Sequence, residues 1–309
     1  MNDVGRIPWY RSLRWRLLYM VLPFLAFVFV FSYLPLLGWY FAFVDFQPGV
    51  PPWEMPFVGF KWFESIVSSP AQLATILRVL RNTLAMNFLG LLTSVLPLVF
   101  AILLYELRSS RLRRTVQTLT TAPHFVSWVL VYALVFAFLS ADSGLINNLL
   151  IDFGVIDAPI NFLISPDHVW LKMTALGLWK SIGWSAIMYL AAINGIDQDL
   201  YEAAYMDGAN RFQRAVHVTL PGLLPTFFVL LLLSIANMIN SGMDQYFVFA
   251  NAMNKDTIEV LDLYVYNIGI SQGNFSFATV ISILKTVVSL VLLFSVNGLS
   301  KRVRGESIF

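Results

Sequence analysis

Long apolar runs alternate with short polar stretches over nearly the whole chain. A helix needs about 20 apolar residues to cross the hydrocarbon core of a bilayer. Six windows meet this requirement, at residues 17–39, 82–105, 119–139, 172–193, 223–243 and 277–298. Because a segment in lipid must satisfy its own backbone polar groups, such runs indicate helices. The pattern therefore predicts an all-α integral membrane protein with six transmembrane helices.

The first window follows Arg11, Arg14 and Arg16, as the apolar run of a secretory signal sequence would. Its run is longer than an ordinary signal sequence and continues to Trp39 without a small-residue cleavage site. We expect a retained helix, preceded by an interfacial segment over residues 1–16 with Pro8 in its first turn.

Composition supports the same class. Hydrophobic residues make up 58% of the 309 positions, charged residues only 12%, and the mean hydropathy is +0.71. No long polar stretch remains for a separate soluble core, so we expect one transmembrane domain over residues 17–298 and a tail over 299–309. A net charge of +2 is too small to suggest nucleic acid, and the absence of cysteine excludes disulfides and thiolate metal sites.

The basic residues are distributed unevenly between the two sides that six spans define. Five lie on the side of the first interspan loop, and thirteen lie on the side of the termini. The thirteen are Arg6, Arg11, Arg14, Arg16, Arg108, Arg111, Arg113, Arg114, Arg211, Arg214, Lys301, Arg302 and Arg304. By the positive-inside rule, this asymmetry predicts a multi-pass protein of the cell membrane with both termini and residues 199–225 in the cytoplasm.

Residues 199–225 form a polar and charged stretch between two apolar runs. Asp199 with Glu202 three residues later resembles a capping box, and Gly208 can adopt the left-handed conformation that ends a helix. We expect a helix over 200–206, a turn at Gly208 and a second helix over 210–219 that Pro221 stops. Such a helix pair at the membrane surface suits contact with a soluble partner.

The same stretch resembles a known family. EAAYMDGANRFQRAVHVTLP, at residues 202–221, is similar to the EAA loop of permease subunits in binding-protein-dependent ABC importers. FVGFKWFESIVSSP at 57–70 and RNTL at 81–84 are similar to MalF-like sugar permeases. GMDQYFVFAN at 242–251 and the segment 260–279 resemble the branch that handles complex oligosaccharides and polysaccharide fragments.

The resemblance implies a fold and a mechanism. The architecture would be that of a type I ABC importer permease (MetI-like), with residues 197–221 as the coupling loop. The matching coupling positions are Glu202, Ala203, Ala204, Asp207, Gly208 and Ala209. The implied partners are a second permease in a heterodimer, a cytoplasmic ATPase dimer that uses ATP and magnesium, and an extracellular solute-binding protein that delivers an oligosaccharide.

No motif for catalysis or nucleotide binding is present. The chain lacks the G-x-x-x-x-G-K-[S/T] phosphate loop and the G-x-S-x-G elbow, and its three histidines lie far apart. We therefore expect no catalytic residue, no metal and no cofactor in this subunit.

Two lysines lie inside the predicted spans. Lys180 and Lys285 are each about nine residues from the outer end of a window, or about 13 Å deep at 1.5 Å per residue. A central lysine costs about 2.5–3.5 kcal/mol on insertion scales, so both should face protein or water. They either contact substrate hydroxyls or carboxylates along a polar path, or pair with a buried acceptor.

Other polar residues are further candidates for a substrate path. Asn237, Asn240, Asp244 and Gln245 lie along the outer half of the fifth window and its exit. Hydrogen bonds between helices are the alternative role for these groups. Trp184 beside Lys180 offers a face for a sugar ring, and membrane packing is the alternative.

The sequence leaves other functions open. A permease for a different solute would retain the EAA-like loop but lack the sugar-type segments. A secondary transporter would bring internal repeats with paired broken helices, and the sequence has no convincing repeat.

Overall fold

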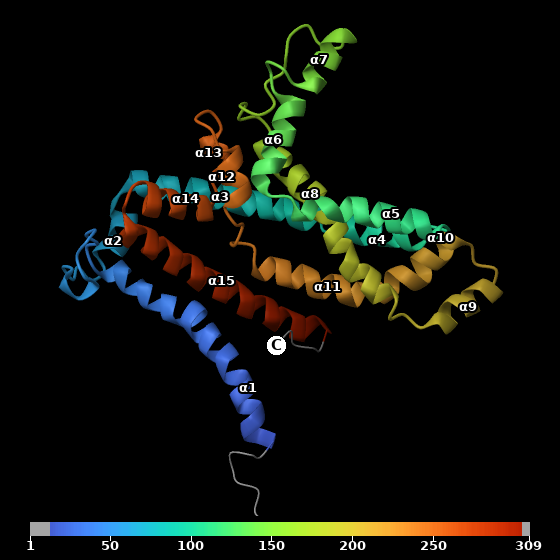
Figure 1. Cartoon of the computed structure of the whole chain (residues 1–309), viewed down its shortest axis with the longest axis horizontal. Coiled ribbons are helices and arrows are strands. Elements are labelled where there is room, and N and C mark those ends of the chain that lie inside the picture. Colours follow the sequence, from blue (N-terminus) through green and yellow to red (C-terminus); the bar gives the residue numbers. More distant parts are fainter. Residues whose placement is uncertain (1–12, 305–309) are drawn as a thin grey trace, which may run out of the picture. The chain divides into compact units, whose positions relative to one another are not determined.

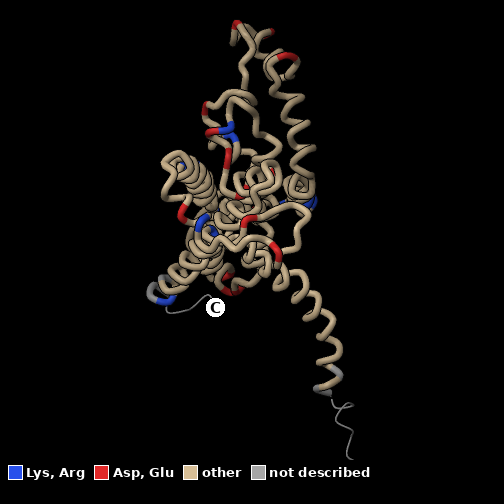
Figure 2. The backbone as a smooth tube through the Cα atoms, turned by 90° about the vertical axis from the view of Figure 1, so that its left-hand side faces the viewer, with Lys and Arg blue, Asp and Glu red and all other residues tan. Residues whose placement is uncertain are grey.

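The computed structural model describes residues 13–304, which divide into two compact units. Unit 1 comprises residues 1–68 and 268–283, and unit 2 comprises residues 69–267 and 284–309. Apart from one antiparallel bridge between Val44 and Phe57, the regular elements of the described residues are helical. The interfacial segment predicted over 1–16 and the tail over 299–309 fall partly outside the described residues. Charged positions are sparse along the backbone (Figure 2).

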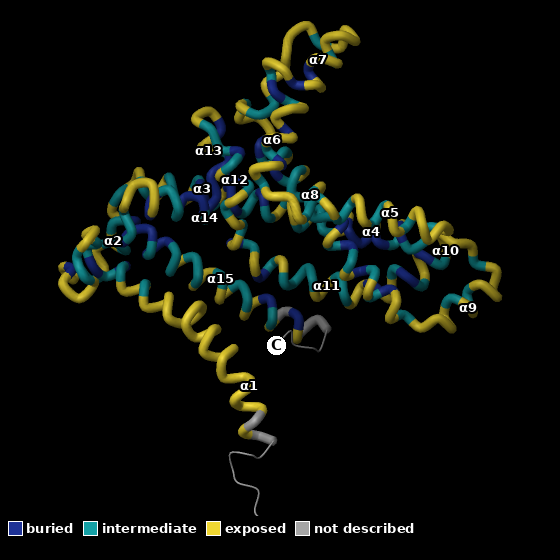
Figure 3. The backbone as a smooth tube through the Cα atoms, viewed as in Figure 1, coloured by how far each residue is buried: buried dark blue, intermediate teal, exposed yellow. Residues whose placement is uncertain are grey.

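Unit 1 begins with a single long helical run. Its elements are α1 (Leu13–Val28), the π-helix η2 (Phe29–Tyr33), the 3-10 helix η3 (Leu34–Phe43), the short 3-10 helix η4 (Pro52–Glu54) and α2 (Lys61–Ser68). The described residues of α1 are exposed (Figure 3). This apolar exposure is what a lipid-facing helix requires.

The loop after η3 is fixed to the first turn of α15 (Phe275–Arg304) within unit 1. The Ser276 hydroxyl accepts from the Phe46 amide at 3.0 Å and donates to the Val44 carbonyl at 2.7 Å. The Phe46 and Phe275 rings lie 4.6 Å apart. Backbone and ring contacts therefore order this loop without a strand.

Unit 2 contains the remaining helices (Figure 1). They are α3 (Pro70–Thr93), α4 (Val95–Tyr105), α5 (Ser110–Thr121), the 3-10 helix η5 (Ala122–Phe125), α6 (Trp128–Leu139), α7 (Leu145–Asp152), α8 (Val169–Ile193), α9 (Gln198–Met206), α10 (Arg211–Arg214), the π-helix η6 (Ala215–Thr219), α11 (Leu220–Ala236), α12 (Asp244–Phe249), α13 (Lys255–Ile258) and α14 (Leu261–Tyr266). The π-helix η7 (Asn267–Ser271) leads from unit 2 back to unit 1.

Helix α8 is the centre of unit 2, where it packs against α3, α4, α5 and α11. One buried cluster joins Leu98 and Ala101 of α4 to Ala186, Tyr189 and Ile193 of α8, and Leu223 of α11 completes it. Helices α9 and α10 lie at one end of this helix group, and α13 and α14 lie beside α3 toward the other (Figure 1).

The backbones of α8 and α5 approach so closely at Gly183 that no side chain fits there. A Cβ on Gly183 would lie 2.3 Å from the carbonyl carbon and oxygen of Thr120. Backbone atoms cannot move aside as a flexible side chain can, so only glycine permits this packing.

Five helical runs are long and apolar enough to cross a membrane, and a sixth becomes possible if one bent pair counts as a span. The five are Leu17–Phe43, Pro70–Tyr105, Val169–Ile193, Arg211–Ala236 and Phe275–Gly298. They overlap five of the six predicted windows, so a helix long enough to span is confirmed at each of those five.

The third window corresponds to a bent pair of helices, which is the possible sixth span. Ser110–Phe125 and Trp128–Leu139 meet at an angle of 107°. Pro123 lacks an amide proton, the chain turns extended at Val126, and the Ser127 side chain caps α6 by accepting from the Leu130 amide. The sequence 123–127 thus ends one helix and begins another.

Two further boundaries differ from the predicted windows. Helix α3 begins at Pro70, earlier than the second window, and ends at Thr93. Pro97 has no amide proton, so the Thr93 carbonyl cannot receive the helical hydrogen bond from residue 97. The fifth helix ends at Ala236 rather than Met243, and Gly242 has a left-handed backbone with φ +70°. Asn240 therefore lies in irregular backbone, and Asp244 and Gln245 belong to α12.

The Gly183 contact predicts that Gly183→Ala destabilises the protein by about 1–3 kcal/mol, because the added methyl group must separate α8 from α5. The thermal midpoint of the purified protein in detergent measures this effect. Gly298→Ala is the matched control, since nothing lies within 4 Å of a Cβ at this helical position. Equal midpoints for both variants would contradict the close approach.

Candidate functional site

A cavity with a volume of about 630 Å³ opens among α3, α4, α8, α11 and α12 of unit 2. Its apolar wall includes Met86, Met173, Met188 and Phe227. Its polar lining consists of Asn87, Thr93, Ser94, Thr174, Ser181, Trp184, Ser185, Tyr189, Ser234, Asn237, Gln245 and Tyr246. A concave site with an apolar wall and convergent hydroxyl and amide groups is suited to a small polar ligand.

Three of the predicted path residues meet in this cavity: Trp184, Asn237 and Gln245. The Gln245 amide donates to the Met173 carbonyl at 2.8 Å, which ties α12 to α8. The Asn237 amide donates to the Leu233 carbonyl at 3.0 Å, at the end of α11. Whether these residues contact substrate stays a prediction.

Trp184 presents an aromatic surface whose orientation is fixed. Its ring stacks on His124 with centroids 4.6 Å apart and planes 1° from parallel, while Phe125 meets it edge-on. Trp184 remains 45% exposed and lines the cavity. The bend between α5 and α6 supplies both partner rings, so the cavity wall depends on that bend.

Lys180 lies outside the cavity lining. Its Nζ donates to the Pro123 carbonyl at 3.1 Å and to the His124 carbonyl at 2.6 Å, and it lies 5.5 Å from the Trp128 ring centroid. These carbonyls lie at the C-terminal end of the helical run that precedes the break. The C-terminal end of a helix carries partial negative charge, so a cation is favourable there. Of the two roles considered for Lys180, substrate contact or pairing with a buried acceptor, these contacts match the second.

Lys285 of α15 forms an ion pair with Asp262 of α14. The second carboxylate oxygen of Asp262 accepts from the Gly242 amide at 2.9 Å. This pair therefore holds the irregular segment after α11, whose Ser241 hydroxyl accepts from Asn87 at 2.6 Å. Lys285 also lies outside the lining, as do the exposed residues Asn240 and Asp244.

Tyr246 completes one wall with an uncharged hydroxyl group. Burial, with a smaller contribution from the Asp262 carboxylate, raises the pKa of Tyr246 to about 12. The phenol is therefore protonated at physiological pH.

Sequence reasoning did not single out the serine and threonine residues of the cavity. Thr174, Ser181, Ser185 and the glycine at 177 follow one face of α8 at helical spacing. A search for small polar residues at i, i+3 and i+4 within the apolar windows would have found this stripe.

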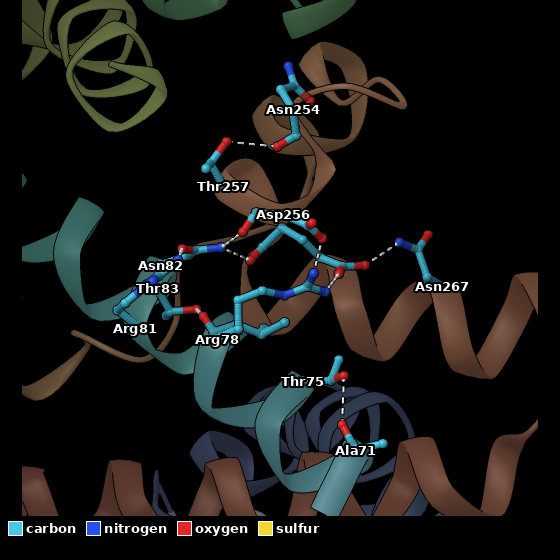
Figure 4. Close-up of polar contacts among 12 residues, drawn as sticks. Ala71, Thr75, Arg78, Arg81, Asn82, Thr83, Asn254, Asp256, Thr257 and Asn267 are labelled. Atoms are coloured by element: carbon cyan, nitrogen blue, oxygen red, sulfur yellow. Dashed lines mark hydrogen bonds and ion pairs between the residues drawn. The ribbon is translucent and has the colours of Figure 1, made fainter. Parts of the chain in front are cut away.

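A second polar cluster joins α3 to α13 and α14 (Figure 4). Arg78 pairs with Asp256 and, at 3.3 Å, with Glu259, which is only 2% exposed. Asn267 donates to the other Glu259 oxygen at 3.0 Å. Buried charges need such partners, so these contacts fix α13 and α14 on α3.

Asn82 and Thr83 extend this cluster to the backbone. The Asn82 amide donates to the carbonyls of Asp256 and Glu259 at 2.9 and 3.2 Å, and the Leu261 amide donates to the Thr83 hydroxyl at 2.9 Å. Two segments that carried the family resemblance, 81–84 and 260–279, thus meet at these hydrogen bonds.

The predicted coupling positions lie on α9 and the turn after it. Gly208 has φ +79°, and the Ala209 amide bonds the Ala204 carbonyl at 2.9 Å, so the predicted glycine turn is confirmed. Glu202, Ala203 and Asp207 are exposed, and Ala204 is half-buried. Leu200, Tyr205 and Met206 add exposed apolar surface.

Two details of this segment were wrong. The N-cap of α9 is Asp197 rather than Asp199, and the capping box belongs to Asn210 and Gln213 at the start of α10. Pro221 does not stop the second helix, because it lies in the first turn of α11, where an amide proton is not needed. The helical run therefore continues from Arg211 to Ala236.

Among residues 13–304, no three histidine, aspartate or glutamate side chains gather as a metal-ligand set.

Comparison with known proteins gives consistent similarities. Residues 94–305 match the family described as binding-protein-dependent transport system inner membrane component. The chain is 38% identical to Protein LplB of Bacillus subtilis, over 98% of this chain and 94% of that protein. It is 38% identical to the polygalacturonan/rhamnogalacturonan transport system permease protein YteP of the same species, over 94% and 89%.

A solved structure is also similar. It is that of a bacterial alginate ABC transporter in complex with an alginate pentasaccharide-bound periplasmic protein. One of its chains has a TM-score of 0.84 and 30% identity, over 97% of this chain and 100% of that chain.

The polar cluster predicts that Asn82→Ala lowers the free energy of unfolding by about 1–3 kcal/mol, because two backbone carbonyls lose their donor in a site where Asn82 is 0% exposed. Thermal unfolding in detergent measures the change. Asp256→Asn is the control and should cost less than about 1 kcal/mol, since the Asp256 side chain is 75% exposed. An equal loss in both variants would refute the assigned role of Asn82.

The Lys285–Asp262 pair gives a second prediction. Either Lys285→Met or Asp262→Asn should destabilise by about 2–3 kcal/mol, because each leaves a charge that is only 17% or 21% exposed without its partner. The double variant should recover part of that loss. Additive losses in a double-mutant cycle would show that the two charges are independent.

Proposed function

The chain belongs to the family of binding-protein-dependent transport system inner membrane components, and we propose that it moves an oligosaccharide or polysaccharide fragment into the cytoplasm as one permease of an ATP-driven importer. It is a multi-pass membrane permease of the sugar or polysaccharide ABC importer class. The observation that carries the substrate assignment is the cavity, whose polar lining is made of hydroxyl, amide and aromatic groups.

The α9 segment is the contact with a cytoplasmic ATPase in this proposal. Its exposed Leu200, Tyr205 and Met206 provide an apolar surface, and Glu202 adds a carboxylate at its edge. Gly208 sets the angle between α9 and α10. A small exposed helix with an apolar face is suited to insertion into a groove of a partner.

Movement of α9 reaches the cavity by two routes. The first is the continuous helical run Arg211–Ala236, about 39 Å long at 1.5 Å per residue, which carries Leu230 and Ser234 of the cavity wall. The Tyr201 hydroxyl, 3.0 Å from the Thr219 hydroxyl, ties α9 to the start of this run.

The second route is Arg211, which donates to the Glu106 carbonyl at 3.2 Å at the end of α4. Rotation of α9 would therefore displace α11 and α4 together.

The remaining parts of the importer follow from this assignment. A second, distinct permease would complete the pathway, and an extracellular solute-binding protein would deliver the sugar. The partner ATPase would bind ATP and magnesium, and both termini of this chain would lie in the cytoplasm. A permease for a non-sugar solute and a secondary transporter are not favoured by the similar proteins.

The test is uptake and receptor-stimulated ATP hydrolysis by the complete importer in vesicles. We expect Glu202→Ala and Gly208→Ala each to lower both rates by about tenfold, because one removes a contact with the ATPase and the other strains a backbone with φ +79°. The purified complex should retain its membrane subunits.

Matched controls separate coupling from general damage. Glu64→Ala removes an exposed helical carboxylate on α2, and Gly154→Ala adds the same methyl group at φ +66° with nothing within 4 Å. Both should transport as the unaltered protein does. Uptake without any ATPase, or equal rates in all four variants, would overturn the proposal.

A further inference from the structure

The lining of the cavity carries no formal charge among the described residues. Its polar side chains are serine, threonine, asparagine, glutamine, tyrosine and tryptophan. An ion that enters such a site loses hydration and meets only neutral dipoles, which is costly, whereas hydroxyl groups exchange water for equivalent neutral partners. The lining thus favours an uncharged ligand.

The ammonium group of Lys180, which is next to the lining residue Ser181 in sequence, already has hydrogen-bond partners in the protein. Lys180 precedes the lining residue Ser181 on α8, yet its Nζ donates to the carbonyls of Pro123 and His124 at 3.1 and 2.6 Å. Two of the three ammonium protons are therefore held at the helix break, and Lys180 itself is not part of the cavity lining.

The positive charge of Lys285 is balanced by the carboxylate of Asp262. Lys285 pairs with Asp262, whose other oxygen accepts from the Gly242 amide at 2.9 Å. The pair contributes no net charge to the neighbouring wall, and a ligand anion would have to compete with a fixed carboxylate. Neither Lys180 nor Lys285 is therefore available as a free cation in the cavity wall.

We propose that this cavity binds an uncharged saccharide segment and discriminates against uronate-containing chains. The inference rests on the proposed function and narrows its substrate class. Trp184 supplies the surface against which a sugar ring packs, since its ring is held by His124 and remains 45% exposed. The side-chain oxygens of Asn87, Ser234 and Asn237 accept hydrogen bonds from its hydroxyl groups, because each of these side chains already donates within the protein.

The test compares a charged and a neutral tetrasaccharide that differ only in the C6 group of each sugar. These are tetragalacturonide and the tetrasaccharide obtained from it by reduction of each carboxylate to a hydroxymethyl group. Binding of each to the complete importer in nanodiscs, without the binding protein, is measured by calorimetry at low and high salt. We expect the neutral tetrasaccharide to bind at least about tenfold more tightly, with no dependence on salt.

Two variants locate the binding in the cavity. Asn237→Asp adds a negative charge to the lining and should lower the ratio of uronide affinity to neutral affinity, whereas Ser234→Lys adds a positive charge and should raise it. The ratio is informative even where one variant weakens both probes. Because the two substitutions act in opposite directions, the loss of one variant through misfolding still leaves a test.

Three results would overturn the inference. They are tighter binding of the uronide with an affinity that falls as salt rises, binding of neither probe at millimolar concentration, and a ratio that neither variant changes. Tight uronide binding would leave the proposed function intact, because the response of uptake and ATP hydrolysis to Glu202→Ala does not depend on the charge of the sugar.

Discussion

The close approach of α8 to α5 at Gly183 is the contact on which the cavity depends. Because no side chain separates the two backbones, Lys180 reaches the carbonyls of Pro123 and His124, and Trp184 stacks on the His124 ring. One glycine therefore brings together the helix break, the ammonium group that caps it and the aromatic wall of the cavity. Apolar packing alone gives no such specificity in a bilayer, where lipid is as apolar as the side chains.

The wall formed after α11 depends on polar contacts instead. The short helices α12, α13 and α14 do not span, and their positions are set by Gln245 against α8, Asn82 and Arg78 against α13 and α14, and Lys285 against Asp262. In this wall Glu259 pairs with Arg78, and Asp262 pairs with Lys285. The ionisable groups of this wall thus hold the short helices in place, whereas the side chains that line the cavity are neutral.

The sequence predicted the elements whose signals are local and strong. Five apolar windows and the left-handed turn at Gly208 are of this kind. The break at 123–127 was missed because the apolar run continues through it, although Pro123 and Ser127 are ordinary stop and start signals. The partners of Lys180 and Lys285 lie 56 and 23 residues away in sequence, so no periodicity identifies them. Of the predicted path residues, the lining includes Trp184, Asn237 and Gln245, whose roles stay predictions.

The π-helix η6 between α10 and α11 has a consequence for how the helices before it are oriented. A π-turn is equivalent to one residue inserted into an α-helix. Deleting one residue from Ala215–Thr219 would restore a regular helix, yet it would rotate α10 and the α9 segment by about 100° relative to α11. A single residue in η6 therefore sets the rotation of α9 and α10 relative to Leu230 and Ser234, two of the residues of α11 that line the cavity.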